Sequence, residues 1–183
     1  MDFSLIPWGN AYYNTSACGG KHGYNKTRMY CWIKECGVDK PPADCFTSPV
    51  LCQHGPNECL ANRIEAFAVS YSNETIAALF TICFEALFDP SWMNGTKRDV
   101  YNAASQCAVK FHISQTSLIG CAKGDQGAKL EKEMAEKTAK YGVNREGTPW
   151  VVVNGQVLKD SNKELLPAIC KNYTGTKPPG CKM

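Results

Sequence analysis

Cys52-Gln53-His54-Gly55-Pro56-Asn57-Glu58-Cys59-Leu60-Ala61-Asn62 is the stretch around which the rest of the chain is organised. It places two cysteines, a histidine, a carboxylate and several amides within eleven residues. Pro56 suits the first position of a helix, because proline has no N–H to leave unpaired there. Apolar residues then recur at helical spacing, which predicts a helix from Asn57 to Tyr71 with one apolar face. The residues of that face are Leu60, Ile64, Phe67, Ala68 and Tyr71.

Length and charge exclude several classes of protein. A chain of 183 residues is long enough for one domain with a real core and short for two, so we expect a single domain over residues 1–183. The net charge is only +3 and both signs are interspersed, which argues against nucleic acid as a partner. No apolar run approaches membrane-spanning length, so membrane insertion is not expected.

Cysteine content points to an oxidising compartment. Eleven cysteines in 183 residues indicate disulfides, and the odd number requires at least one thiol to be free or paired with another chain. Five N-glycosylation acceptor triplets agree with a secretory route. They begin at Asn14, Asn25, Asn73, Asn94 and Asn172. Because residues 1–7 do not resemble a signal peptide, we expect an N-terminal segment to be missing.

The pattern along the chain predicts strands, a helical block and a hairpin. Phe3–Trp8 is a short apolar run typical of a buried strand. Residues 57–142 form the helical block, in which Asn73 and Ser114 are expected N-caps and Gly142 ends the last helix. Residues 148–173 contain two β-branched runs around Asn-Gly, the strongest short hairpin signal, and then a final helix. These elements predict an α/β or α+β class.

Residues 12–51 form a cysteine-rich insertion with little periodicity. A connection of that length needs a clamp, and two local disulfides among its four cysteines would supply one. Those cysteines are Cys18, Cys31, Cys36 and Cys45. A zinc site that uses His22 with these cysteines is the alternative. Disulfides are favoured, because the spacing lacks a C-x-x-C pair and an oxidising compartment disfavours free thiolates. No metal and no cofactor is predicted.

The string C-Q-H-G-x-x-E-C-x-x-N resembles the hallmark of the gamma-interferon-inducible lysosomal thiol reductases, the GILT family. A disulfide-stapled loop ahead of an amphipathic helix describes the same local structure without the family. Three further segments are similar to the family: Pro7-Trp8-Gly9-Asn10-Ala11, Cys121 to Gly127, and the stretch from Pro149 to Leu158 with the later Cys170 and Cys181. The resemblance covers essentially all of the chain except residues 12–51.

This resemblance implies a thioredoxin-like α/β fold with a helical insertion. It also implies reduction of protein disulfides in an acidic endosomal or lysosomal lumen, with a small-molecule thiol as the reductant of the complete enzyme. The family's catalytic C-x-x-C lies upstream of the P-x-G-N-A segment, and the present 183 residues contain no C-x-x-C. The chain is therefore expected to lack the first strand and the dithiol helix, to contain no catalytic residue and to be inactive alone. Thr148 and Pro149 are expected to form a cis bond that faces substrate.

The motif residues receive structural rather than catalytic roles. We expect Cys52 and Cys59 to hold the loop of Gln53, His54 and Gly55, with His54 as a structural histidine rather than a catalytic one. Glu58 and Asn62 are expected at the helix start and in its packing. The family pattern continues N-x4-C, but this chain has Phe67 at that cysteine position, so the partner of that cysteine is free or re-paired.

Two alternatives from other classes stay open at this point. One is a non-catalytic secreted or lysosomal glycoprotein that kept the scaffold and lost the dithiol. The other is a disulfide-clamped binding module that uses residues 12–51 as its recognition surface.

Overall fold

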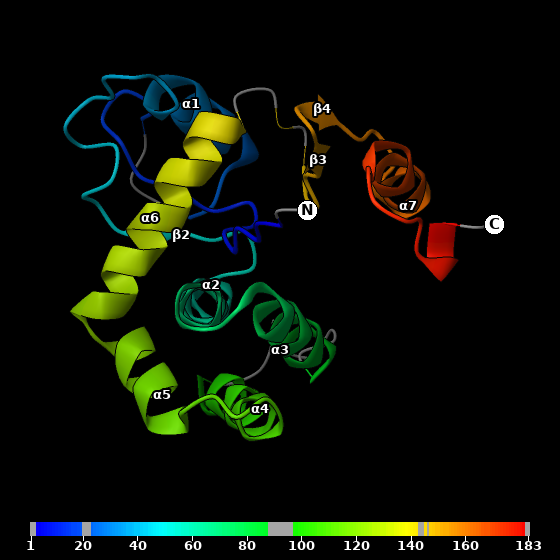
Figure 1. The fold of residues 1–183 in the computed structure, drawn as a ribbon. Coiled ribbons are helices and arrows are strands. Elements are labelled where there is room, and N and C mark those ends of the chain that lie inside the picture. Colours follow the sequence, from blue (N-terminus) through cyan, green and yellow to red (C-terminus); the bar gives the residue numbers. More distant parts are fainter. Residues whose placement is uncertain (1–2, 20–22, 88–96, 143–144, 146, 182–183) are drawn as a thin grey trace. The chain divides into compact units, whose positions relative to one another are not determined.

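The computed structural model describes residues 3–19, 23–87, 97–142, 145 and 147–181. These residues divide into two compact units, one from Phe3 to Val143 and one from Asn144 onward. The described part is mostly helical and has two small antiparallel sheets (Figure 1). The mixed α and β content agrees with the sequence, whereas the thioredoxin-like arrangement stays a prediction. No helix within the described ranges is long and apolar enough to cross a membrane.

The larger unit contains six helices and one two-stranded sheet among its described residues. The helices are α1 (Lys26–Cys36), α2 (Pro56–Tyr71), α3 (Glu74–Leu87), α4 (Lys97–Lys110), α5 (Gln115–Lys123) and α6 (Asp125–Tyr141). Strand β1 (Tyr12–Tyr13) pairs antiparallel with β2 (Val50–Leu51), with Tyr12 opposite Leu51.

Helix α2 is the central element of this unit. It packs against α3, α4, α5 and α6, and Figure 1 shows it almost end-on among them. The predicted helix is confirmed, with Pro56 as its first residue. Because several helices surround it, its buried surface extends beyond one stripe. Its buried apolar side chains are Leu60, Ala61, Ile64, Ala66, Phe67 and Ala68.

Three of the helices have an N-cap residue with a short polar side chain. Oδ1 of Asn73 accepts the N–H of Ile76 at 2.9 Å, and Oγ of Ser114 accepts that of Ser117 at 3.3 Å. Both predicted caps are thereby confirmed. Oδ1 of Asn25 caps α1 in the same way. Such caps satisfy N–H groups that the first turn of a helix leaves without partners.

The strand predicted at Phe3–Trp8 is wrong. Residues 3–6 have no regular structure and Pro7–Asn10 form a turn, in which Gly9 takes φ +59°. Trp8 is fully buried, and its Nε1–H donates to the carbonyl of Ala11 at 2.8 Å. The apolar residues of this run are therefore buried by a turn that folds back on itself, with Pro7 and Gly9 supplying the conformations that the turn needs.

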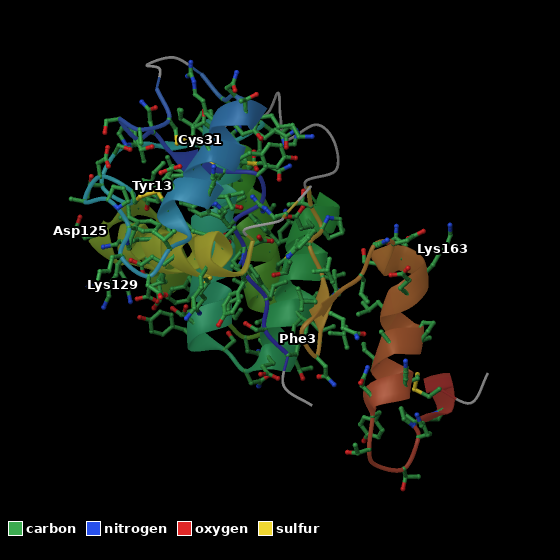
Figure 2. All side chains as sticks on the ribbon, turned by 90° about the horizontal axis from the view of Figure 1, so that it is seen from above. Phe3, Tyr13, Cys31, Asp125, Lys129 and Lys163 are labelled. Atoms are coloured by element: carbon green, nitrogen blue, oxygen red, sulfur yellow. A yellow bond between two sulfur atoms is a disulfide. The ribbon has the colours of Figure 1, made fainter. Side chains whose placement is uncertain are left out.

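Residues 12–51 are clamped as predicted, but they also contain a helix that was not predicted. Disulfides join Cys18 to Cys31 and Cys36 to Cys45. Figure 2 labels Cys31 of α1 and Tyr13 of β1 within this segment. Since all four cysteines are oxidised, none offers the thiolate that the zinc alternative requires; His22 lies outside the described residues.

Aromatic side chains fix this segment to the rest of the unit. Trp32 of α1 lies 5.8 Å from Trp8 and 5.9 Å from Phe46, measured between ring centroids. Tyr13 stacks on Trp8 at 5.7 Å. Nε1–H of Trp32 donates to the carbonyl of Cys45 at 2.9 Å. Helix α1 also packs on α6, so residues 12–51 contribute to the core rather than forming a separate surface loop.

The C-terminal unit has a hairpin, a helix and one disulfide. Strands β3 (Val152–Val153) and β4 (Gln156–Val157) pair through an Asn154–Gly155 turn, in which both residues have positive φ. Helix α7 (Ser161–Asn172) follows, then a short 3₁₀ helix (Pro179–Cys181) tied to it by Cys170–Cys181. The peptide bond between Thr148 and Pro149 is cis.

Candidate functional site

The Cys52–Asn62 stretch forms a closed loop that leads directly into α2. A disulfide joins Cys52 to Cys59 with a Cα–Cα distance of 5.7 Å, so it links the loop to the first turn of the helix. The N–H of Gly55 donates to the carbonyl of Cys52 at 3.1 Å and closes a turn. Gly55 has φ +92°, a conformation that a residue with a side chain rarely adopts. The two cysteines therefore hold the loop.

Glu58 organises this loop from the first turn of α2. Its Oε2 accepts the backbone N–H of His54 at 2.6 Å and lies 3.5 Å from Nδ1 of the same residue. This contact resembles a capping box, in which a glutamate at the third position of a helix accepts a hydrogen bond from a backbone N–H before the helix. Glu58 is 8% exposed. Burial raises the pKa of its carboxyl, the His54 N–H and imidazole oppose that rise, and the charge of Glu85 adds to it.

Two of the segments that resemble the family meet at one place, which we call the motif junction (residues 8–10 with residues 53–62). Nδ2 of Asn62 donates to the carbonyl of Trp8 at 3.0 Å. Nδ2 of Asn10 donates to Oε1 of Gln53 at 2.8 Å. Periodicity and spacing gave no signal for this docking, because the contacts join residues more than forty positions apart.

Gly9 completes the motif junction by leaving space for Glu58. A Cβ atom at Gly9 would lie 2.9 Å from Oε1 of Glu58, closer than such contacts normally allow. Positive φ and this close approach both favour glycine at the position. The carboxylate of Glu58 is thus packed between two segments, the turn of residues 7–10 and the loop of residues 52–55.

An ion pair beside the motif junction was missed by sequence reasoning. Nε and Nη2 of Arg63 donate to Oε2 of Glu131 at 2.9 and 2.7 Å, which joins α2 to α6. The side chain of Glu131 is 2% exposed. Burial works against the charge of Arg63, but the hydrogen bond and charge of Glu131 raise its pKa above the ordinary value. Burial and, secondarily, the charge of Glu131 raise the pKa of the Tyr13 hydroxyl.

No cysteine offers an accessible thiol, and all eleven lie in the described part of the chain. Ten form disulfides, including a Cys83–Cys107 link between α3 and α4 that was not predicted. The remaining one, Cys121 on α5, is buried, and burial raises the pKa of its thiol. A thiolate is the attacking form in disulfide exchange, and the burial of Cys121 disfavours that form. Within the described residues, His, Cys, Asp and Glu form no group of three suited to a metal.

The remaining predicted site residues lie apart from the motif junction in sequence. Thr148 and Pro149 are exposed residues of the C-terminal unit. Among the glycosylation acceptors, Asn25, Asn73 and Asn172 are exposed and Asn14 is partly buried. Asn94 lies outside the described residues.

A family model covers α2 and the loop before it, and several known proteins match most of this chain. The family model described as gamma interferon inducible lysosomal thiol reductase (GILT) matches residues 38–111. A mouse gamma-interferon-inducible lysosomal thiol reductase is 34% identical over 128 residues, which cover 70% of this chain and 48% of the relative. The chain belongs to the GILT family.

Two further GILT relatives come from distant organisms. A goldfish (Carassius auratus) protein with the same name as the mouse relative is 30% identical over 138 residues, 72% of this chain and 50% of the relative. An Arabidopsis thaliana gamma-interferon-responsive lysosomal thiol protein is 32% identical over 138 residues, 72% and 53% respectively. The chain spans about half the length of these relatives.

The GILT match includes the whole Cys52–Asn62 stretch and helices α2 and α3. Phe67, at the position where the motif continues with cysteine, is buried and stacks on Tyr71 with a centroid distance of 4.7 Å. The extra apolar ring thus has a packing role where the GILT pattern has a sulfur.

Proposed function

We propose that this chain forms the scaffold of a GILT-type thiol–disulfide oxidoreductase that acts on disulfide-containing proteins. The motif junction is the observation that carries the proposal. Its residues lock the loop of Cys52–Cys59 and the turn of residues 7–10 to the start of α2 through Glu58 and Asn62. A rigid arrangement of this kind suits a protein that must hold a reactive dithiol in a fixed position.

The proposed chemistry is thiol–disulfide exchange through a mixed disulfide. A thiolate attacks a substrate disulfide and releases one substrate thiolate, and a second cysteine then displaces the other while the enzyme becomes oxidised. Two molecules of a small thiol then reduce the enzyme disulfide to the dithiol form and are themselves joined in a disulfide. Both cysteines belong to the family's C-x-x-C, which these 183 residues do not contain. We place Thr148 and Pro149 opposite the substrate, in the thioredoxin-like arrangement that the resemblance implies.

The proposed compartment is the endosome or lysosome, reached by the secretory route. The names of the mouse and Arabidopsis relatives place those proteins in the lysosome. Five disulfides and the exposed acceptors Asn25, Asn73 and Asn172 agree with an oxidising route in which glycans are attached.

A reductase assay in three forms of the protein tests this proposal. The substrate is a protein whose fluorescence rises when its disulfide is reduced, at pH 5 with cysteine as the reductant. The 183-residue chain should add nothing to the rate of the reductant alone, and Cys121→Ser should change nothing. The chain joined to an upstream segment that carries the family's C-x-x-C should turn over, whereas the matched S-x-x-S form should not. Equal rates in these two joined forms would contradict the proposal.

A non-catalytic glycoprotein is the second candidate function. It is favoured by the state of the cysteines, since none of the eleven is both free and accessible. A folded C-x-x-C form that shows no turnover would favour this candidate over the first.

The third alternative, a recognition module at residues 12–51, has less support. Trp32 and Tyr13 of that segment pack on Trp8 of the motif junction, so the segment does not fold apart from the rest. Deleting it should unfold the larger unit rather than remove only a binding surface.

A further inference from the structure

Helix α7 has one apolar side, yet none of its residues is buried. Leu165, Leu166 and Ile169 recur at spacings that place them on one side of the helix, and Tyr173, which follows it, continues that side. Leu165 and Leu166 are 38% and 43% exposed. A helix of a globular protein usually turns such a side toward a core. We call these four residues the apolar face of α7.

The hairpin beside α7 does not supply a core for the apolar face. Strand β3 contacts α7, but Val152 of β3 and Val157 of β4 are 45% and 43% exposed. Arg145 is the only buried residue among the described residues of the C-terminal unit. A two-stranded hairpin is marginally stable by itself, so a partner that covers apolar side chains would stabilise this unit.

The net charge of the chain lies in the same unit. Residues 144–183 contain six lysines and arginines against three aspartates and glutamates, which gives +3, the value for the whole chain. Residues 1–143 contain fourteen of each kind and are neutral. Figure 2 labels Lys163 of α7, whose Nζ lies 3.0 Å from Oδ2 of Asp160. A charge difference of this kind between two parts of a chain indicates an anionic partner. The exposed lysines of the unit are Lys159, Lys163, Lys171 and Lys177.

An anionic membrane surface fits both the exposed leucines and the charge. A soluble polyanion would pair with the lysines but leave Leu165 and Leu166 in water. A second copy of the chain would cover these leucines but would bring one positively charged unit against another. At a membrane, apolar side chains enter the boundary between head groups and acyl chains, while lysines lie at the anionic head groups. The twelve residues of α7 span about 18 Å, so the helix would lie along the surface rather than cross it.

We propose that the C-terminal unit binds the surface of an anionic membrane through the apolar face of α7, with its exposed lysines at the lipid head groups. The binding is weak and reversible, because one short helix buries few side chains, and it decreases as salt screens the lysines. This inference is independent of the proposed function, because it requires no dithiol and no substrate.

Vesicle flotation with the full oxidised chain at pH 5.5 tests this proposal. The protein should float with vesicles of phosphatidylcholine and phosphatidylserine, float far less with phosphatidylcholine alone, and detach as salt is added. Leu165→Ser combined with Leu166→Ser should weaken binding by about tenfold or more, because it removes the apolar contact. Leu79→Ser combined with Ile82→Ser, at exposed positions of α3, is the matched control and should bind like the wild type.

A second pair of variants tests the lysines. Lys159→Gln combined with Lys171→Gln should weaken binding to the anionic vesicles by about 25-fold, since each lysine near such a surface contributes about fivefold. Lys129→Gln combined with Lys137→Gln makes the same change of charge at exposed positions of α6 and should stay within about twofold of the wild type. Circular dichroism should show the same helix content in all four variants, because every substituted side chain is exposed.

Two outcomes of the flotation assay would overturn the proposal. If the chain did not float with the anionic vesicles, or floated equally well with the neutral ones, no anionic membrane would be its partner. If the lysine variant lost binding while the Leu165 and Leu166 variant kept it, the surface would bind anions through charge alone, as a soluble polyanion would require.

Two further measurements distinguish a membrane from other partners of the apolar face. Sedimentation should find a monomer, whereas a dimer that the Leu165 and Leu166 substitutions dissociate would assign this face to a second copy. The chain joined to the upstream segment of the reductase assay should still float with the anionic vesicles. Loss of flotation in that joined form would show that the upstream segment covers α7, and would overturn the proposal.

Discussion

The amide of Asn62 donates to the backbone carbonyl of Trp8 at 3.0 Å, across fifty-four positions of sequence. Both residues are buried, and each belongs to a segment by which the chain resembles the GILT family. One residue from each of two separate motifs thus takes part in one contact. An asparagine at this position of α2 serves the turn of residues 7–10 rather than the helix itself.

Asn62→Ala should destabilise the protein by about 1–3 kcal/mol, because it leaves the buried carbonyl of Trp8 without a donor. Urea unfolding measures this loss. Asn162→Ala, at an exposed position of α7, is the matched control and should stay within about 0.5 kcal/mol of the wild type. If the two variants were equally stable, the hydrogen bond from Asn62 to Trp8 would not contribute to the stability of the motif junction.

Gly9→Ala should cost about 1–3 kcal/mol, because it combines positive φ with a Cβ atom 2.9 Å from Oε1 of Glu58. Gly120→Ala is the control, and its effect on stability should have the opposite sign. Gly120 lies within α5 with open space beside it, so alanine there should stabilise by about 0.5–1 kcal/mol. Thermal unfolding of the two variants should therefore shift the midpoint in opposite directions. A shift of the same sign in both would refute this assignment.

Arg63→Met should destabilise by about 2–3 kcal/mol, because Glu131 would remain buried without its partner. The double change Arg63→Met with Glu131→Leu should recover part of that loss, since it removes both charges. A double-mutant cycle by urea unfolding measures the difference. Additive losses would mean that the two side chains do not stabilise each other.

Alkylation followed by peptide mapping should find one free thiol. In denaturant without reductant, Cys121 should be labelled and the other ten cysteines should not. In the folded protein Cys121 should react slowly, because it is buried and burial raises the pKa of its thiol. A label on Cys52 or Cys59 would show that the loop of the motif junction is not closed by a disulfide.

Sequence reasoning succeeds here where the signal is local. The start of α2 is determined by Pro56 and by apolar spacing within the helix, and the caps at Asn73 and Ser114 are set by neighbours three residues away. The paired cysteines of residues 12–51 are also close in sequence, with separations of 13 and 9.

The predictions failed where local signals compete and where contacts join residues that are far apart in the sequence. Phe3–Trp8 has the composition of a strand, yet Pro7, Gly9 and the Trp8–Ala11 hydrogen bond make a turn. Helix α1 was missed although its buried residues recur at helical spacing, because glycines, prolines and cysteines dominate the surrounding segment. Those residues are Met29, Trp32, Ile33 and Cys36.

The polar pair that joins α2 to α6 could not be predicted from the sequence. Glu131 contacts Arg63 across sixty-eight positions. This pair has neither helical spacing nor a motif, so only the packing of α2 against α6 reveals it.

Asn25 and Asn73 each begin a helix through the side-chain oxygen, whereas a sugar would be attached through the nitrogen. One asparagine side chain can therefore cap the helix through its oxygen and carry a sugar through its nitrogen. An amidase that strips the sugar converts asparagine to aspartate, which caps a helix equally well and adds a negative charge at its positive end. If a glycan is attached at either residue, its enzymatic removal should thus strengthen the first turn of α1 or α3 instead of weakening it.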